Sequence, residues 1–430
     1  MLMAMLMLVF LHSQSPAQNS RASADASKKR GDILQGEGRF ADAIKAYSDA
    51  IAIDNKLAEA FVNRGRAQES MRKSEEALAD YDRAIAINPH LGIAYNNRAI
   101  LKFARRGLEE AMRDFDKAIE VSPDLAEAYY NRGCAWNALG NVEKAIADFN
   151  LAIPRFPKFF ASSVSLSATN PNQAVAYNAR GLAFQAKGDI ETALADFSAS
   201  TRINPNFAEA YNNRGTLRMQ KGDIAAAILD YDMSIRTNPG FAETYYNRGR
   251  ARKTAGNLDG ALEDFEKAIA INPSIALARL GRGAIRFEKS DFDGAALDFE
   301  SVIRLNSRVS EAYNYLGLIY ERKEQPALAV SNFTRALEIN PDSAEAYCNR
   351  GRVLAAQGEL AAAVSDLDKA ILMHPDDALA YFQRGSAQLR QGKSTEAESD
   401  FAKSLAVDRN LRMLLEPRIA ALRNAMASHH

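Results

Sequence analysis

Small, apolar and polar residues recur along the chain with a period of 34 residues. Eleven copies align on this period; they run from residue 24 to 159 and, after a gap, from residue 174 to 411. Position 8 of the copy is Gly in ten copies, position 20 is Ala in all eleven, and position 24 is aromatic in ten. Position 32 is Pro in eight copies. A repeat of this length indicates one supersecondary unit that stacks on itself.

The spacing of these columns predicts two helices in each copy. Positions 4, 8 and 11 share one helical face, and positions 20, 24 and 27 share a second. Small residues at positions 8 and 20 allow the two helices to approach closely, and the aromatic residue at position 24 fills the remaining space. Pro at position 32 ends the second helix because it cannot donate to the helical ladder. Each copy is therefore a helical hairpin whose core is completed by its neighbours.

This pattern of small, small, aromatic and Pro columns resembles the tetratricopeptide repeat family over residues 24–411. The resemblance implies an all-α fold, a right-handed superhelical solenoid of helix-turn-helix repeats with the first helices on its concave side. It also implies recognition of a protein or an extended peptide in the concave groove, without catalysis. The chain after the last copy, residues 412–430, carries an apolar stripe and is expected to form a capping helix that covers the end of the solenoid. The stripe consists of Leu414, Leu415, Ile419 and Leu422.

Two segments fall outside the repeat. Residues 1–17 hold an uncharged apolar run that is too short to cross a bilayer, which needs about 20 apolar residues. The run and the small residues Ser15 and Ala17 favour a signal peptide cleaved after Ala17, and hence a secreted or periplasmic protein without stable membrane insertion. The run is not preceded by Lys or Arg, so an unprocessed tail and a cytoplasmic location form the alternative. Residues 160–173 are an insertion rich in Ser, Thr and Asn, read either as a surface loop or as a hinge between four repeats and seven.

Composition narrows the function. The chain has 54 basic and 54 acidic residues, so net charge gives no argument for a nucleic-acid partner. Its two cysteines are far apart in the repeat array, and its five histidines show no nucleophile or metal-ligand spacing. We therefore expect no enzymatic activity, no metal and no cofactor. The basic stretch 248–253 is interpreted as helix surface, and Arg218, Arg252 and Arg286 at position 11 are expected to pair with acids; an exposed anion-binding stripe is the alternative.

Two polar columns covary between the copies. Position 7 is Arg in ten copies and position 23 is Asp in nine. The one copy without the Arg, which has Leu316 instead, also lacks the Asp and has Asn332. We predict an Arg–Asp pair that joins the two helices of each hairpin.

Position 6 provides the candidate binding residues. It lies opposite the face formed by positions 4, 8 and 11, so it is not expected to serve the hairpin core, and a side-chain amide there can bind a peptide backbone through both donor and acceptor. The row of amides is similar to the concave Asn ladder of the O-linked N-acetylglucosamine transferases. The alternative is that duplication copied these Asn residues with the repeat. The ladder consists of Asn63, Asn97, Asn131, Asn213, Asn247 and Asn349; Arg66, Arg250 and Arg352 at position 9 and Tyr130 and Tyr246 at position 5 complete the candidate set.

Two further comparisons limit the function. The carboxylate clamp that binds chaperone tails in this family is not matched, because Asp32, Ile93 and Asn97 occupy positions where it needs other residues. A self-assembling or envelope-organising protein without a peptide groove is the alternative function, and a homo-oligomer is compatible with both.

Overall fold

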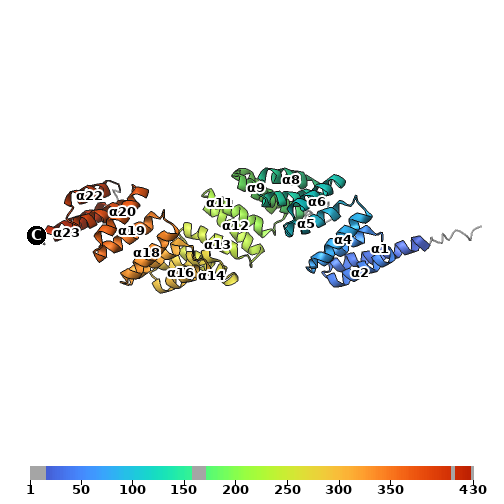
Figure 1. Ribbon diagram of the computed structural model, residues 1–430, viewed down its shortest axis with the longest axis horizontal. Helices are drawn as coiled ribbons and strands as arrows, with labels where there is room; N and C mark the ends of the chain where they lie inside the picture. The colour runs from blue at the N-terminus through green and yellow to red at the C-terminus, as the bar shows by residue number, and fades with distance from the viewer. Residues whose placement is uncertain (1–15, 157–170, 408–411, 428–430) are drawn as a thin grey trace, which may run out of the picture. The chain divides into compact units, whose positions relative to one another are not determined.

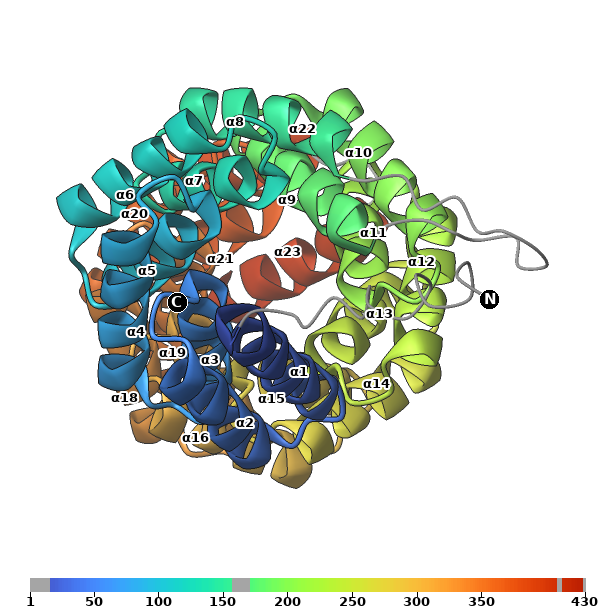
Figure 2. The ribbon, with the colours of Figure 1, turned by 90° about the vertical axis from the view of Figure 1, so that its right-hand side faces the viewer.

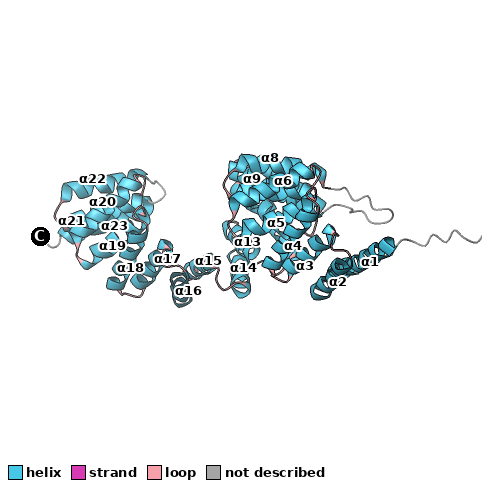
Figure 3. Ribbon diagram, turned by 45° about the vertical axis from the view of Figure 1, so that its right-hand side comes forward, coloured by secondary structure: helices cyan, strands magenta, loops and turns pink. Residues whose placement is uncertain are grey.

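The structure, a computed structural model, describes residues 16–156, 171–407 and 412–427 (Figure 1). Over these ranges the secondary structure consists of helices joined by short turns (Figure 3), and the prediction of an all-α solenoid of helical hairpins is confirmed. The chain divides into two compact units, residues 1–217 and 218–430. The boundary between them falls inside helix α11.

The helices follow the predicted hairpins. The helices of the first unit are α1 (Pro16–Gly36), α2 (Phe40–Ile53), α3 (Ala58–Ser70), α4 (Ser74–Ile87), α5 (Gly92–Ala104), α6 (Leu108–Val121), α7 (Ala126–Ala138), α8 (Val142–Arg155), α9 (Pro171–Lys187) and α10 (Ile190–Ile203), followed by α11 (Ala208–Gln220) at the boundary. The helices of the second unit are α12 (Ile224–Thr237), α13 (Ala242–Thr254), α14 (Leu258–Ile271), α15 (Ala276–Glu288), α16 (Phe292–Leu305), α17 (Ser310–Arg322), α18 (Pro326–Ile339), α19 (Ala344–Gln357), α20 (Leu360–Met373), α21 (Ala378–Arg390), α22 (Ser394–Val407) and α23 (Arg412–Ala427).

Within a unit, each first helix packs against the second helix of its own repeat and against the second helix of the preceding repeat. Figure 2 shows the result for the first unit: the first helices α5, α7 and α9 lie on the inner side of the curve, and α6, α8 and α10 lie outside. The candidate binding residues are all on first helices.

The core of each hairpin is built on the contact between positions 8 and 24. A Cβ atom added to Gly133 would lie 2.8 Å from Phe149 Cε1 and 3.3 Å from the carbonyl oxygen of Ala145. A side chain at Gly133 would force the ring to shift, so the glycine lets the two helices approach closely at this point. The aromatic column is buried in all ten copies that have it; these rings are Tyr47, Tyr81, Phe115, Phe149, Phe197, Tyr231, Phe265, Phe299, Phe333 and Phe401.

The turn between the two helices uses a left-handed residue at position 15. Seven copies have Gly there, for example Gly140 with φ of 76°. Four copies place a residue with a Cβ in the same conformation, namely Arg72, Arg106, Ser290 and Glu324. A left-handed backbone is unfavourable for residues with a Cβ atom. Each of these four turns therefore lowers the free energy of unfolding slightly.

The predicted Arg–Asp pair is confirmed and has a bidentate geometry. In the fourth repeat, Arg132 Nε and Nη2 donate to the two carboxylate oxygens of Asp148 at 2.8 and 2.7 Å. The same two-bond pairing occurs at Arg64–Asp80, Arg98–Asp114, Arg180–Asp196, Arg248–Asp264, Arg282–Asp298, Arg350–Asp366 and Arg384–Asp400. The sequence did not predict a third bond: Arg132 Nη1 also donates to Asp116 of the preceding repeat at 2.7 Å. One guanidinium therefore joins two helices of its own hairpin and the neighbouring hairpin.

The ends and the insertion differ in part from expectation. Helix α1 begins at Pro16, one residue before the expected end of the signal peptide, and residues 1–15 lie outside the described residues. Most of the 160–173 insertion also lies outside them, but its last three residues belong to α9, which begins at Pro171. Helix α23 caps the last repeat, with Leu415 and Ile419 buried against α21 and α22, whereas Leu414 is 46% exposed and does not join that stripe. No helix in the described ranges is long and apolar enough to cross a membrane.

Candidate functional site

The Asn residues of position 6 form hydrogen bonds from one repeat to the next. Asn131 Nδ2 donates to Asn96 Oδ1 at 2.9 Å, and Asn213 Nδ2 donates to Asn178 Oδ1 at 3.1 Å. In the second unit Asn349 Nδ2 donates to Asn314 Oδ1 at 3.2 Å. The acceptor in each case is an Asn at position 5 of the preceding repeat. The ladder is therefore part of the contact between repeats, a role that sequence reasoning did not assign to it.

The other ladder residues vary in exposure. Asn63 donates to Asp32 at 2.8 Å and is half-buried, as is Asn247. Asn97 is only 8% exposed; its Oδ1 accepts from Asn96 at 3.1 Å, and its Nδ2 makes no hydrogen bond to any of the described residues. Position 6 was expected to lie outside the hairpin core; at Asn97 it is nevertheless buried, because it lies in the contact between repeats.

The three arginines of position 9 have different environments. Arg66 on α3 and Arg250 on α13 are exposed, and the Arg250 guanidinium lies 5.7 Å from the ring centre of Tyr246. Arg352 instead forms an ion pair with Glu321 and donates to Asn349 Oδ1 at 3.2 Å, and burial lowers its pKa. Arg66 and Arg250 are thus available to a ligand, whereas Arg352 is engaged within the protein.

The two candidate tyrosines also differ. Tyr130 and Tyr246 are both half-buried, each tilted against the aromatic ring of its own hairpin with ring centres 5.9 and 6.1 Å apart. Burial raises the pKa of both hydroxyl groups. Tyr246 lines a surface hollow, as described below, and is the more accessible candidate of the two.

A polar hollow between α1 and α3 was missed by the sequence analysis. It has a volume of about 480 Å³, and Asp32, Gln35, Tyr47, Asn63 and Arg66 line it. The Tyr47 hydroxyl lies 2.9 Å from both the Asp32 carboxylate and the Gln35 side-chain oxygen, and burial raises its pKa. The sequence feature that could have pointed to this hollow is the Tyr at position 24 of the first copy, because Tyr carries a hydroxyl group that Phe lacks. The Tyr47 and Tyr81 hydroxyl groups both bond to the side chain at position 12 of the first helix, Gln35 and Glu69.

The position-11 arginines behave as predicted. Arg218 Nη1 donates to Asp230 at 2.8 Å, and Arg286 Nη1 donates to Asp298 at 2.9 Å. Arg252 Nη1 lies 3.0 Å from Asp264. Each head group therefore meets the Asp of position 23 and is not part of a free anion-binding stripe.

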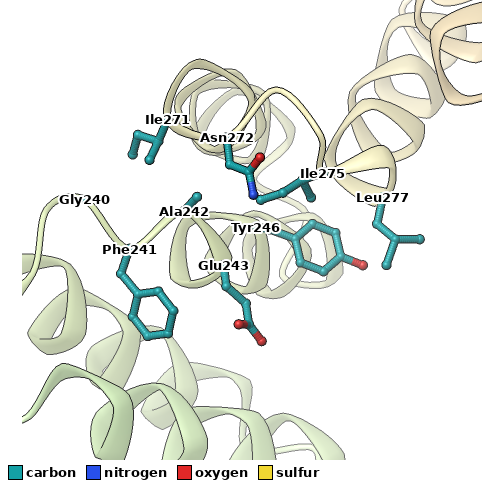
Figure 4. A pocket seen from close by; sticks show the side chains of 9 residues that line it. All are labelled: Gly240, Phe241, Ala242, Glu243, Tyr246, Ile271, Asn272, Ile275 and Leu277. Atoms are coloured by element: carbon teal, nitrogen blue, oxygen red, sulfur yellow. The ribbon is translucent and has the colours of Figure 1, made fainter. Parts of the chain in front are cut away.

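A second hollow lies between the inner ends of α13, α14 and α15 (Figure 4), and it has a volume of about 640 Å³. Its lining is mainly apolar. The residues are Gly240, Phe241, Ala242, Glu243, Tyr246, Ile271, Asn272, Ile275 and Leu277. Figure 4 shows the Tyr246 ring lying between Glu243 on the same helix and Leu277 at the start of α15. Of these residues only Tyr246 was predicted as a site residue. The sequence feature that could have pointed to the hollow is Leu277, which occupies position 2, where six copies have Glu.

The chemistry offered by the inner face is recognition by amides, charges and apolar side chains. Cys134 and Cys348 are free, and burial raises the pKa of Cys348 to about 12, which keeps its thiol protonated. In the ranges that the structure describes, no group of three or more His, Cys, Asp or Glu side chains is placed to hold a metal ion.

These features define a helical-repeat scaffold whose inner face carries polar and apolar binding groups. Profiles described as tetratricopeptide repeat match residues 58–91, 96–158, 208–241, 242–275, 286–344, 316–372 and 348–410, and a profile described as TPR repeat matches residues 181–222. The chain belongs to the tetratricopeptide repeat family. Membership of this family indicates a protein–protein interaction scaffold. No curated protein sequence matches the chain.

Solved structures share the repeat fold. YrrB, described as a TPR protein with an unusual peptide-binding site, is 25% identical, with 44% of this chain and 97% of that chain covered and a TM-score of 0.37. A tetratricopeptide repeat protein from Parabacteroides merdae is 21% identical, with 60% and 97% covered and a TM-score of 0.44. Cut9 in the APC/C hetero-tetramer Cut9–Hcn1 is 13% identical, with 95% and 98% covered and a TM-score of 0.47.

Proposed function

We propose that the chain binds an extended segment of a partner protein along the inner face formed by its first helices. The observation that carries this proposal is the row of hydrogen-bonded amides at positions 5 and 6. A side-chain amide has two donor hydrogens and two acceptor lone pairs, and a ladder bond uses only part of this capacity. In the half-buried Asn131 and Asn213 the remainder is available to a peptide backbone.

Preorganisation supports the same function. Ladder bonds hold the amides in place before a ligand arrives, so binding immobilises fewer free side chains. The exposed guanidinium groups of Arg66 and Arg250 add charged contacts on the same side. The Arg–Asp clamps keep consecutive first helices in register, and thereby fix the spacing of these groups.

The proposal is tested with peptides selected from a phage-displayed library of random twelve-residue sequences on the immobilised full chain. Binding of a selected peptide is then measured for Arg250→Glu, on first helix α13, and for Lys267→Glu, on second helix α14 of the same repeat. Both side chains are exposed, so neither reversal disturbs the core. We expect Arg250→Glu to change the Kd at least fivefold and Lys267→Glu to leave it within twofold. Failure to select any peptide, or equal effects of the two reversals, contradicts the proposal.

A further inference from the structure

The Asn ladder is interrupted in the second unit, where aromatic rings lie in the place of two amides. Position 6 is Gly281 in the eighth repeat and Tyr315 in the ninth. At Gly281 the Phe265 ring occupies the space of a side chain, since a Cβ atom there would lie 2.7 Å from the ring. The Tyr315 ring stacks on Phe299 with ring centres 4.7 Å apart and planes 6° apart. Aromatic packing between repeats therefore takes the place of the amide bonds between α13 and α15 and between α15 and α17.

The inner face of α15 is apolar where the ladder is missing. Positions 2, 5 and 9 of this helix are Leu277, Leu280 and Ala284, and Leu277 is 53% exposed. The hollow between α13, α14 and α15 lies directly beside Leu277, with Ile275 and Phe241 also in its wall (Figure 4). Its volume of about 640 Å³ falls within the range of small-molecule and side-chain pockets. An apolar hollow with an exposed Leu at its edge gains free energy when an apolar side chain covers it.

One charged group lines this hollow. Glu243 is exposed on the first turn of α13, and its carboxylate forms no hydrogen bond or ion pair with any of the described residues. Arg250 stands seven residues later on α13, about 10 Å along the axis, and its guanidinium faces Tyr246. The carboxylate beside the apolar wall is therefore left for a positive charge from outside.

We propose that this hollow is a specificity subsite for a bulky apolar side chain of the bound peptide, with a Lys or Arg of the peptide next to it meeting Glu243. The inference rests on the proposed peptide groove and names what that groove selects in the second unit. Apolar contact supplies the affinity of the anchor, and the single carboxylate supplies the preference for a basic neighbour. A second copy of the chain is the competing occupant.

Two substitutions separate the parts of this subsite. Leu277→Glu places a charge at the edge of the subsite. The variant is expected to fold, because the position is in the first turn of α15, where an acidic side chain is favourable, and six other copies carry Glu there. Glu243→Lys reverses the charge. Leu379→Glu and Glu311→Lys are matched controls, because they make the same changes at position 2 of other repeats, on exposed residues outside the hollow.

The experiment is selection from the same random twelve-residue library on the full-length wild type and the four variants. We expect wild type to enrich Leu, Phe, Ile or Met within two residues of Lys or Arg. Changing that apolar anchor to Ala in a synthetic selected peptide should weaken wild-type binding at least tenfold, but binding to Leu277→Glu less than threefold. Glu243→Lys should weaken the same peptide at least fivefold and recover binding when the peptide's basic residue is changed to Glu. The two control variants should bind as wild type does.

The outcomes distinguish the subsite from the groove. Peptides that are selected without the apolar and basic pattern, or that bind the two pocket variants and wild type equally, overturn the subsite and leave the groove intact. Failure to select any peptide overturns both. Concentration-dependent self-association, seen by light scattering in wild type and lost in Leu277→Glu, assigns the hollow to a second copy and likewise overturns the subsite.

Discussion

Removal of one arginine from the Arg–Asp clamp should have an effect that depends on the repeat in which it is made. In the fourth repeat, Asp148 is 4% exposed and its carboxylate is paired only with Arg132 among the described residues. In the seventh repeat, Asp264 is 2% exposed but lies within ion-pair distance of both Arg248 and Arg252. Arg132→Leu leaves a buried carboxylate without a partner, whereas Arg248→Leu leaves one that retains a cation.

The magnitudes follow from burial. Loss of one partner of a buried ion pair costs about 3–5 kcal/mol of unfolding free energy, because the remaining charge stays desolvated. The bond from Arg132 to Asp116 adds little, since the Asp116 side chain is 63% exposed and returns to water. We expect Arg132→Leu to cost about 3–5 kcal/mol, and Arg248→Leu about 2 kcal/mol less, because the ion pair between Arg252 and Asp264 is retained. The double variant Arg132→Leu with Asp148→Asn should recover about 2 kcal/mol.

Repeat arrays unfold in segments, so the assay must be local. Native-state hydrogen exchange of the amides in α7 and α8 reports the opening free energy of the fourth repeat, and the amides of α13 and α14 report that of the seventh. Urea unfolding followed by circular dichroism provides the global value. Equal losses for Arg132→Leu and Arg248→Leu, or a double variant no more stable than Arg132→Leu alone, would refute the clamp as a desolvated pair.

Three other consequences can be measured directly. Arg106→Gly, at a left-handed turn with φ of 65°, should raise the unfolding free energy by about 0.5–1 kcal/mol, and Gly140→Ala at the equivalent turn should lower it, both measured by urea unfolding. Gly133→Ala should lower the unfolding free energy by about 1–3 kcal/mol through the contact with Phe149, although Ala is the better helix former. Gly36→Ala, whose added Cβ meets no atom within 4 Å, should not lower it. A larger loss for Gly36→Ala than for Gly133→Ala would exclude the close approach. Because burial raises the pKa of Cys348 to about 12, iodoacetamide should modify it at pH 8 at least a hundredfold more slowly than in the urea-unfolded chain, as followed by mass spectrometry; similar rates would show that the thiol is not buried in this way.

The repeat pattern made most of the fold predictable. The columns at positions 8, 20, 24 and 32 depend on packing within a hairpin, which is local in sequence and identical in every copy. The Arg–Asp pair could be found for the same reason, since the ninth copy lost Arg and Asp together, with Leu316 and Asn332 in their places.

Contacts between copies were not visible in the same way. The bond from Arg132 to Asp116 and the bond from Asn131 to Asn96 join different repeats, and their partners vary from copy to copy. The hollow beside Leu277 depends on three helices from two repeats. Helical phasing predicts that position 6 lies opposite the hairpin core, but it does not tell which amides form hydrogen bonds to a neighbouring repeat.

The central claim is that the inner face of the first helices binds an extended peptide. Hydrogen–deuterium exchange of the full chain, with and without a saturating library-selected peptide, tests this most directly, because it maps protection helix by helix. The account predicts new protection in the first turns of α13 and α15 and in other first helices, with the exposed outer faces of α12, α14 and α16 unchanged. Protection confined to second helices, or to the ends of the array, would contradict it.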